Sequence, residues 1–277
     1  TPLQGMNLVA HNGGIYRIGG MAPINAKGKE TDNHSVKSCA RYDVATKKWE
    51  PLPDLNVPRS SHDVVVLNDK LIVIGGWNME GAEKGDTWLD TMEVLDLKEK
   101  NPAWKTTEQP FRRRALIAVA RGNQVYVIGG FDEDDNPRKL VDVLDIKTNQ
   151  WSKGPQLPGS PMNGFAPAAC VHDGDVYVSV FDGSLHRLNA AGDAWDLVAN
   201  ATPRIVHRLA PIGSKVLMIG GASFTGNLDS IEGVTVSPKK VLPKPDSPKA
   251  AAPKSDKSDG HPAEAKAPVP KSAVSKQ

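Results

Sequence analysis

The sequence is poor in cysteine and in long hydrophobic runs, and it carries little net charge. Two cysteines in 277 residues exclude a disulfide framework and a four-cysteine zinc site. The longest run without polar residues, glycine or proline is Ala115–Ala120, whereas a membrane-spanning helix needs about 20 apolar residues. The 34 basic and 32 acidic residues nearly balance, so no globally basic surface is available for nucleic acid. We therefore expect neither a membrane span nor a specific nucleic-acid partner.

The composition changes sharply at Ser237. Residues 237–277 contain eight prolines, seven alanines, nine lysines and four acids, which gives this segment a net charge of +5. Such a segment has too few apolar groups to offset the entropy that is lost on ordering. We therefore predict a disordered tail from 237 to 277 after a folded region from 1 to 236. The tail is either a plain linker or a weak tether to an anionic surface.

A short apolar motif that ends in two glycines recurs in the folded region. Its copies are IYRIGG (Ile15–Gly20), LIVIGG (Leu71–Gly76), VYVIGG (Val125–Gly130), VLMIGG (Val216–Gly221) and the degenerate VYVSVF (Val176–Phe181). Each copy is preceded by another apolar run and a short polar turn, which predicts a hairpin. Because these runs are apolar on successive residues, we expect each sheet to be covered on both faces.

A second motif follows each of the first four copies. It consists of an acidic or amide residue, a polar turn and a tryptophan, and it predicts a second hairpin. Its residues are Asp43 and Trp49, Asp96 and Trp104, Asp145 and Trp151, and Asn189 and Trp195. Each repeat is therefore predicted to form four antiparallel strands, A to D.

Two motifs in register, which recur at a spacing of about 50 residues, resemble the kelch repeat over residues 1–236. The resemblance implies an all-β, kelch-type β-propeller, of which five four-stranded repeats are visible. The fifth repeat has strand A at 207–212, strand B at 215–220 and strand C at 230–236, and it lacks strand D. The chain also begins at a strand A. Since kelch propellers usually have six or seven blades, we expect these repeats to be part of a larger ring with sequence upstream.

The sequence contains no recognisable catalytic or metal-binding motif. Ser61, His62 and Asp63 are consecutive strand residues, which point to opposite faces and cannot form a triad. The acidic run 132–136 lacks the glycine and glutamate of a calcium loop, and the seven histidines lack metal-ligand spacing. We predict no cofactor or metal and favour a protein that is not an enzyme. Nothing in the sequence assigns a compartment.

The likeness to a propeller places B–C loops and D–A connections on one face of the disc. The B–C loops are long in the first three repeats, at 21–35, 77–90 and 131–139, and long loops on a rigid scaffold commonly carry function. Arg59, Arg113 and Arg204 each stand at the same sequence distance before the first residue of their doublet, and we assign this place to Met162 and Leu3 in the other two repeats.

These arginines have two interpretations. Either they ring the mouth of the channel and bind a carboxylate or phosphate through their guanidinium groups, or they pack against neighbouring blades. Trp77 and Phe131, which directly follow a doublet, are candidates either for aromatic anchors or for core. The predicted ligand-binding set is Arg59, His62, Trp77, Arg113, Arg114, Phe131, Asn163, Phe165, Arg204 and His207.

Two functions compete on this evidence. The first is a non-enzymatic binding module that holds a protein partner or an acidic ligand on the B–C/D–A face. The alternative is an enzyme for acidic sugars that resembles the kelch sialic acid mutarotases, with His62 or His207 moving a proton. A third, the adaptor role of kelch domains in ubiquitin ligases, ranks last because no recruiting domain is visible in the sequence.

Overall fold

The polar turns between the apolar runs form tight hairpins. The computed structural model describes residues 2–236. In it β7 (Asp63–Leu67) and β8 (Lys70–Ile74) pair through a two-residue loop. The loop residues Asn68 and Asp69 have φ of 52° and 58°, the left-handed conformation that matches the twist of the flanking strands. Local sequence therefore fixes the register of the innermost hairpin.

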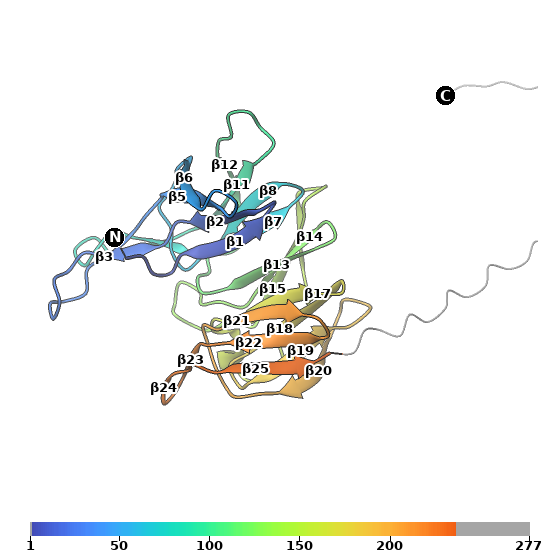
Figure 1. Cartoon of the computed structure of the whole chain (residues 1–277). Helices are drawn as coiled ribbons and strands as arrows, with labels where there is room; N and C mark the ends of the chain where they lie inside the picture. Colours follow the sequence, from blue (N-terminus) through green and yellow to red (C-terminus); the bar gives the residue numbers. More distant parts are fainter. Residues whose placement is uncertain (1, 237–277) are drawn as a thin grey trace, which may run out of the picture. The chain divides into compact units, whose positions relative to one another are not determined.

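The described residues form five antiparallel sheets of three or four strands in chain order, one for each predicted repeat (Figure 1). Blades 1 to 4 have four strands each, and blade 5 has three strands among these residues. Blade 1 holds β1 (Asn7–His11), β2 (Gly14–Ile18), β5 (Cys39–Asp43) and β6 (Lys48–Leu52); blade 2 holds β7, β8, β11 (Thr91–Asp96) and β12 (Lys105–Glu108); blade 3 holds β13 (Ile117–Arg121), β14 (Gln124–Ile128), β15 (Val141–Asp145) and β16 (Gln150–Lys153); blade 4 holds β17 (Ala168–His172), β18 (Asp175–Ser179), β19 (Ser184–Leu188) and β20 (Trp195–Asn200); blade 5 holds β21 (Arg208–Ile212), β22 (Lys215–Ile219) and β25 (Ile231–Thr235). This arrangement confirms the predicted all-β propeller fold with five repeats, the last of which has three strands among the described residues. That these repeats are part of a six- or seven-bladed ring stays a prediction.

The hydrophobic core is a series of layers between successive blades. Four apolar clusters join blades 1 and 2, 2 and 3, 3 and 4, and 4 and 5, and the A strands of successive blades contact one another. Two of the motif tryptophans, Trp104 and Trp195, form hydrogen bonds from one blade to the preceding one. The indole Nε1 of Trp104 donates to the Pro53 carbonyl of the preceding blade at 2.8 Å, and that of Trp195 donates to the Pro155 carbonyl at 2.8 Å.

The two end blades differ from the three inner ones. Strands β14 and β18 are buried on successive residues, as predicted, whereas β2 and β22 alternate between buried and less buried positions. No sheet of the described residues covers the outer faces of blades 1 and 5. The expected cover on both faces is therefore seen for the three inner blades, whereas one face of each end blade is exposed among the described residues, and Trp49 in blade 1 is 54% exposed.

The first doublet glycine lets the next blade approach closely, since a Cβ on Gly75 would lie 2.7 Å from the Arg113 carbonyl oxygen of the next repeat. The second doublet glycine lets a segment of its own repeat approach. Gly75 and Gly76 have φ of 71° and 90°, and a Cβ on Gly76 would lie 2.6 Å from the Ser60 carbonyl oxygen. This close approach brings the segment before strand A against the end of strand B in the same repeat. The doublets therefore shape the end of the blades where strand A begins.

Two of the long B–C loops contain hairpins of their own. These hairpins are β3 (Met21–Pro23) with β4 (Asn33–Ser35) in blade 1, and β9 (Trp77–Met79) with β10 (Asp86–Trp88) in blade 2. Blade 5 adds the short pair β23 (Ala222–Ser223) and β24 (Gly226–Asn227), and a 3₁₀ helix, η1 (Pro161–Gly164), precedes blade 4. The predicted tail at 237–277 lies outside the described residues.

Candidate binding site at the mouth of the channel

The segments that enter strand A in all five repeats line one cavity of about 250 Å³, which we call the mouth. It lies at the end of the blades that also carries the B–C loops. The lining residues are Gly5, Met6, Asn7, Ser61, His62, Arg114, Ala115, Leu116, Phe165, Ala166, Pro167, Val206 and Arg208. Every repeat thus contributes backbone or side chains to the same small space.

A ladder of backbone hydrogen bonds from blade to blade forms the rim of the mouth. The amide of Ser61 donates to the Gly5 carbonyl at 2.9 Å, and the amide of Ala115 donates to the Ser61 carbonyl at 2.8 Å. Ala166 and Val206 continue the ladder at 3.1 and 3.3 Å. These residues occupy one register position relative to the doublet, and all five have φ between 44° and 56°.

This conformation is unfavourable for residues other than glycine and costs about 1–3 kcal/mol at each position. It persists at Ser61, Ala115, Ala166 and Val206 in the described structure. A strained backbone ring that the surrounding blades hold in place gives the mouth a rigid rim. Strain of this kind gathers at ligand sites in proteins, which makes the mouth the strongest candidate site.

Two arginines reach the mouth from different blades, Arg114 before blade 3 and Arg208 at the start of blade 5. The guanidinium carbon of Arg114 lies 4.1 Å from the ring centre of Trp77 and 5.2 Å from those of Trp88 and Phe131. Phe131 stacks in turn on Phe165, with 4.4 Å between ring centres. Trp77 and Phe131 therefore contact Arg114 but are not among the residues that line the mouth, whereas Phe165 lines it and contacts Phe131.

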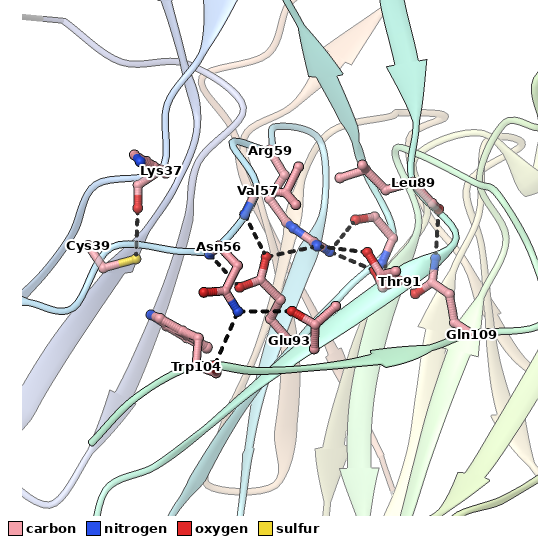
Figure 2. A network of polar contacts seen from close by, with 12 residues as sticks. Lys37, Cys39, Asn56, Val57, Arg59, Leu89, Thr91, Glu93, Trp104 and Gln109 are labelled. Carbon is pink, nitrogen blue, oxygen red and sulfur yellow. Dashed lines mark hydrogen bonds and ion pairs between the residues drawn. The ribbon is translucent and has the colours of Figure 1, made fainter. Parts of the chain in front are cut away.

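The three aligned arginines lie elsewhere. Arg59 is completely buried and pairs with Glu93, which is also buried, at 3.1 Å (Figure 2). Its Nη1 also donates to the carbonyls of Gly75 and Thr91. Arg59 is thus held by internal partners and does not line the mouth.

Arg113 and Arg204 repeat the same contacts in their own blades. Arg113 donates to the Gly129 carbonyl at 2.6 Å and pairs with Asp142 at 2.5 Å. Arg204 donates to the Gly220 carbonyl at 3.0 Å and pairs with Glu232. In all three repeats the arginine bonds the first doublet glycine and an acid of strand C. These contacts support the packing interpretation of the aligned arginines.

The arginine and its acid are present together or absent together. In blade 1 the equivalent positions hold Leu3 and Ala40. In blade 4 the acid position holds His186, and the backbone bond from Gly130 to Gly164 shows that Gly164, not Met162, takes the place of the arginine. Since a lone buried charge is costly, this joint occurrence is what a structural ion pair requires.

His62 and His207 occupy one register position, directly after the rim residues Ser61 and Val206, and both are buried. Burial, followed by the charge of Arg59, lowers the pKa of His62 to about 3. Burial, followed by the charges of Arg204 and Arg208, lowers the pKa of His207 to about 4. Both imidazoles are therefore neutral at neutral pH.

Asn163, the remaining candidate, is also buried. Its Nδ2 donates to the Pro158 carbonyl at 3.0 Å and to Asp182 at 2.8 Å, so it ties η1 to the turn after β18.

Next to His62, burial raises the pKa of Asp63 to about 6, and the charge of Arg208 partly offsets that rise. Asp63 accepts a hydrogen bond from the Ala118 amide at 2.5 Å.

Sequence reasoning missed Asn7, Ser61, Trp88 and Arg208. Asn7 and Arg208 stand at one common distance before their doublets, so the same counting that aligned Arg59 and Arg113 finds them at another offset.

Within residues 2–236 no group of three or more histidine, cysteine, aspartate or glutamate residues is arranged to hold a metal ion. No helix in that range is long and apolar enough to cross a membrane.

Comparisons with known proteins place this geometry in context. A family model described as the "KLHDC2/KLHL20/DRC7 Kelch-repeats domain" matches residues 5–221. Kelch-like protein 7 of Mus musculus is 28% identical over 147 residues, which are 52% of this chain and 22% of that protein. Alpha-scruin of Limulus polyphemus is 30% identical over 148 residues, which are 52% of this chain and 15% of that protein.

The matched region spans less than a quarter of either relative. A solved structure titled "Structure of YjhT" superposes with a TM-score of 0.70 and covers 86% of this chain and 83% of its own. Its sequence identity of 17% supports a shared fold alone.

Proposed function

Because this chain belongs to the kelch-repeat family of β-propellers, we propose that it is a non-enzymatic binding module whose mouth holds an acidic group of a partner protein. Kelch propellers are typically protein-interaction modules. The observation that carries the proposal is that Arg114 and Arg208, from two blades, both line one cavity with a rigid rim. Guanidinium groups bind carboxylates with charge-assisted hydrogen bonds.

The size of the mouth limits what enters it. Pockets for drug-sized ligands usually enclose about 300–1,000 Å³, so a cavity of about 250 Å³ suits one acidic side chain or one small acid. The rest of a protein partner would lie across the β3–β4 and β9–β10 hairpins. The same volume admits a monosaccharide acid, which keeps the sugar-binding enzyme as the second candidate. The low pKa values of His62 and His207 argue against proton transfer by either imidazole, because an acid–base catalyst works best with a pKa near the working pH.

The test compares two probes on one set of variants. A labelled hexa-aspartate peptide and N-acetylneuraminate are titrated by fluorescence anisotropy and by thermal shift, respectively, against the wild type, Arg114→Gln and Arg208→Gln. Arg121→Gln is the matched control, because Arg121 ends strand β13 on the opposite face.

Peptide binding that is lost in both mouth variants and kept in the control supports the proposal. Stabilisation by the sugar acid that is lost in the same two variants favours the second candidate. A wild type that binds neither probe overturns the proposal. An equal loss of binding in the control also overturns it, because the binding would then reflect overall charge rather than the mouth.

A further inference from the structure

The guanidinium of Arg114 is held in place by rings from two blades. Trp77 and Trp88 belong to the hairpin β9–β10, and their ring centres lie 5.5 Å apart. Phe131 follows the doublet of blade 3, and its backbone forms a bridge with Arg114. Cation–π contacts of this kind hold the group over the ring faces. The direction in which Arg114 presents its N–H groups is therefore set before any ligand arrives.

One carboxylate of the chain already contacts this guanidinium. Nη2 of Arg114 donates to Oδ1 of Asp135 at 2.9 Å. Asp135 belongs to the acidic run 132–136, in the third of the long B–C loops. The contact therefore joins a mouth residue to a loop of the binding face.

A tight turn holds Asp135 in this place. The Asp132 carboxylate accepts hydrogen bonds from the amides of Asp134 at 3.1 Å and Asn136 at 2.9 Å, and it also pairs with Arg138. The Asp135 amide donates to the Asp132 carbonyl at 3.0 Å, and Asp135 has a φ of 55°. The acidic run 132–136, which lacks the glycine and glutamate of a calcium loop, is thus a preformed turn that presents the Asp135 carboxylate to Arg114.

The pair of Arg114 with Asp135 differs from the buried pairs in its exposure. The side chains of Arg114 and Asp135 are 18% and 71% exposed, whereas those of Arg59 and Glu93 are fully buried. An exposed ion pair is weak and screened by salt, so its carboxylate can leave at little cost. A ligand carboxylate that replaced it would restore the same kind of contact.

We propose that Asp135 is an internal competitor for the acidic ligand, occupying the Arg114 guanidinium in the ligand-free protein and leaving it when the ligand binds. This inference rests on the proposed function of the mouth. Asp135 thereby weakens the binding of every acidic ligand by a small factor, and an acidic group with further contacts, such as those with Arg208, offsets this loss.

The experiment measures the affinity of the hexa-aspartate peptide for the wild type, Asp135→Asn, Asp134→Asn, Arg114→Gln and the double variant Arg114→Gln/Asp135→Asn. Asp134→Asn is the matched control, because it removes the same charge from the same turn, while Arg114 forms its ion pair there with Asp135 and not with Asp134. We expect Asp135→Asn to bind about two- to fivefold more tightly than Asp134→Asn at low salt, in line with the strength of an exposed ion pair. The gain should vanish in the double variant.

The outcomes separate this inference from the proposed function. If Arg114→Gln abolishes binding while Asp135→Asn and Asp134→Asn bind alike, the competitor is refuted and the binding role of the mouth stands. A gain in Asp135→Asn that survives in the double variant also refutes the competitor, because the gain would not pass through Arg114. If Arg114→Gln binds like the wild type, both proposals fail.

Discussion

Arg113 and Arg114 are consecutive in the chain but belong to two different regions. Arg113 lies in the layer of buried ion pairs, with its acid in strand C, while Arg114 lines the mouth and its guanidinium lies among aromatic rings. Successive residues of an extended chain point to opposite sides, so one step along the sequence separates packing from exposure. The comparison teaches that the residue type alone does not mark a binding site here. What distinguishes the two arginines is the position of the partner acid, which is buried in strand C for Arg113 and exposed in a loop for Arg114.

The largest effect that separates the two regions should come from Arg59. Replacement by methionine leaves Glu93 buried without its cation, which should lower the free energy of unfolding by about 3–5 kcal/mol. Arg114→Met should cost less, about 1–2 kcal/mol, since its pair with Asp135 is exposed and the main loss is that of its cation–π contacts. Urea unfolding of both variants at pH 7 measures the difference.

The double variant Arg59→Met/Glu93→Leu is the control for this prediction. It should regain part of the lost stability, because no unpaired charge remains buried. Arg113→Met should cost less than Arg59→Met, since Lys153 also pairs with Asp142, at 2.5 Å. Equal losses for Arg59→Met and Arg114→Met would end the distinction between the two regions.

A second, pH-dependent effect should come from His62. Its pKa falls from 6.5 in the unfolded chain to about 3 in the folded protein, so between these values the unfolded chain binds more protons. The stability of the wild type should therefore rise with pH across this window and fall on acidification, by about 1.4 kcal/mol for each unit of pKa shift at most.

His62→Leu removes this contribution, and the chain itself places Leu116 at the equivalent position of blade 3. Unfolding in urea at pH 4.5 and pH 7.5 should show a smaller acid loss in the variant than in the wild type. Asp63 acts in the opposite direction, because its pKa is raised to about 6, but it is present in both proteins. Parallel pH profiles would show that His62 is hydrated rather than buried.

A third and smaller effect should come from Asn163. Its replacement by alanine removes hydrogen bonds to Pro158 and Asp182, and it leaves buried groups unsatisfied at a cost of about 1–3 kcal/mol. Affinity for the peptide probe should stay unchanged at a temperature where the variant is folded. A loss of affinity without a loss of stability would show that Asn163 contacts the ligand and is not a purely structural residue.

The blades could be predicted from the sequence because their signals are local. The apolar runs, the turn residues Asn68 and Asp69 and the doublet glycines act within one hairpin. The ion pairs could not be predicted by counting from the doublet, since loops of variable length separate it from Glu93, Asp142 and Glu232. Counting back by one fixed step from Asp96 or Asp145 does find Glu93 and Asp142, which shows that the signal was present in the other motif.

The mouth was only partly predictable for a different reason. Arg114 and Phe165 followed from the register of the repeats, and both line the cavity. Trp88 lies in the hairpin β9–β10, which occurs outside the four-stranded pattern, so no periodic signal points to it. A contact such as that of Arg114 with Asp135 depends on how a loop folds back, and repeat spacing carries no information about that.

The smallest predicted effect tests whether the two regions are coupled through charge. Arg208 lines the mouth, yet its charge lowers the pKa of the buried Asp63 against the larger effect of burial. In Arg208→Gln the pKa of Asp63 should therefore rise further above its ordinary value. Since the folded protein then holds this proton more tightly than the unfolded chain, stability should fall more steeply from pH 5 to pH 7.5 than in the wild type.

The loss of Arg208 should also raise the pKa of His207, because the charge of Arg208 lowers it in the wild type. The gain in stability that His207 gives as the pH rises from 5 to 7.5 should then be smaller, which adds to the effect of Asp63. A carboxyl ¹³C NMR titration of Asp63 separates the two contributions, with Arg121→Gln as the control for a change of net charge. An Asp63 pKa that is the same in Arg208→Gln and in the control would show that the mouth and the buried layer are electrostatically independent. A rise confined to Arg208→Gln would mean that an anion bound at Arg208 also raises the pKa of Asp63, so that ligand binding is linked to proton uptake.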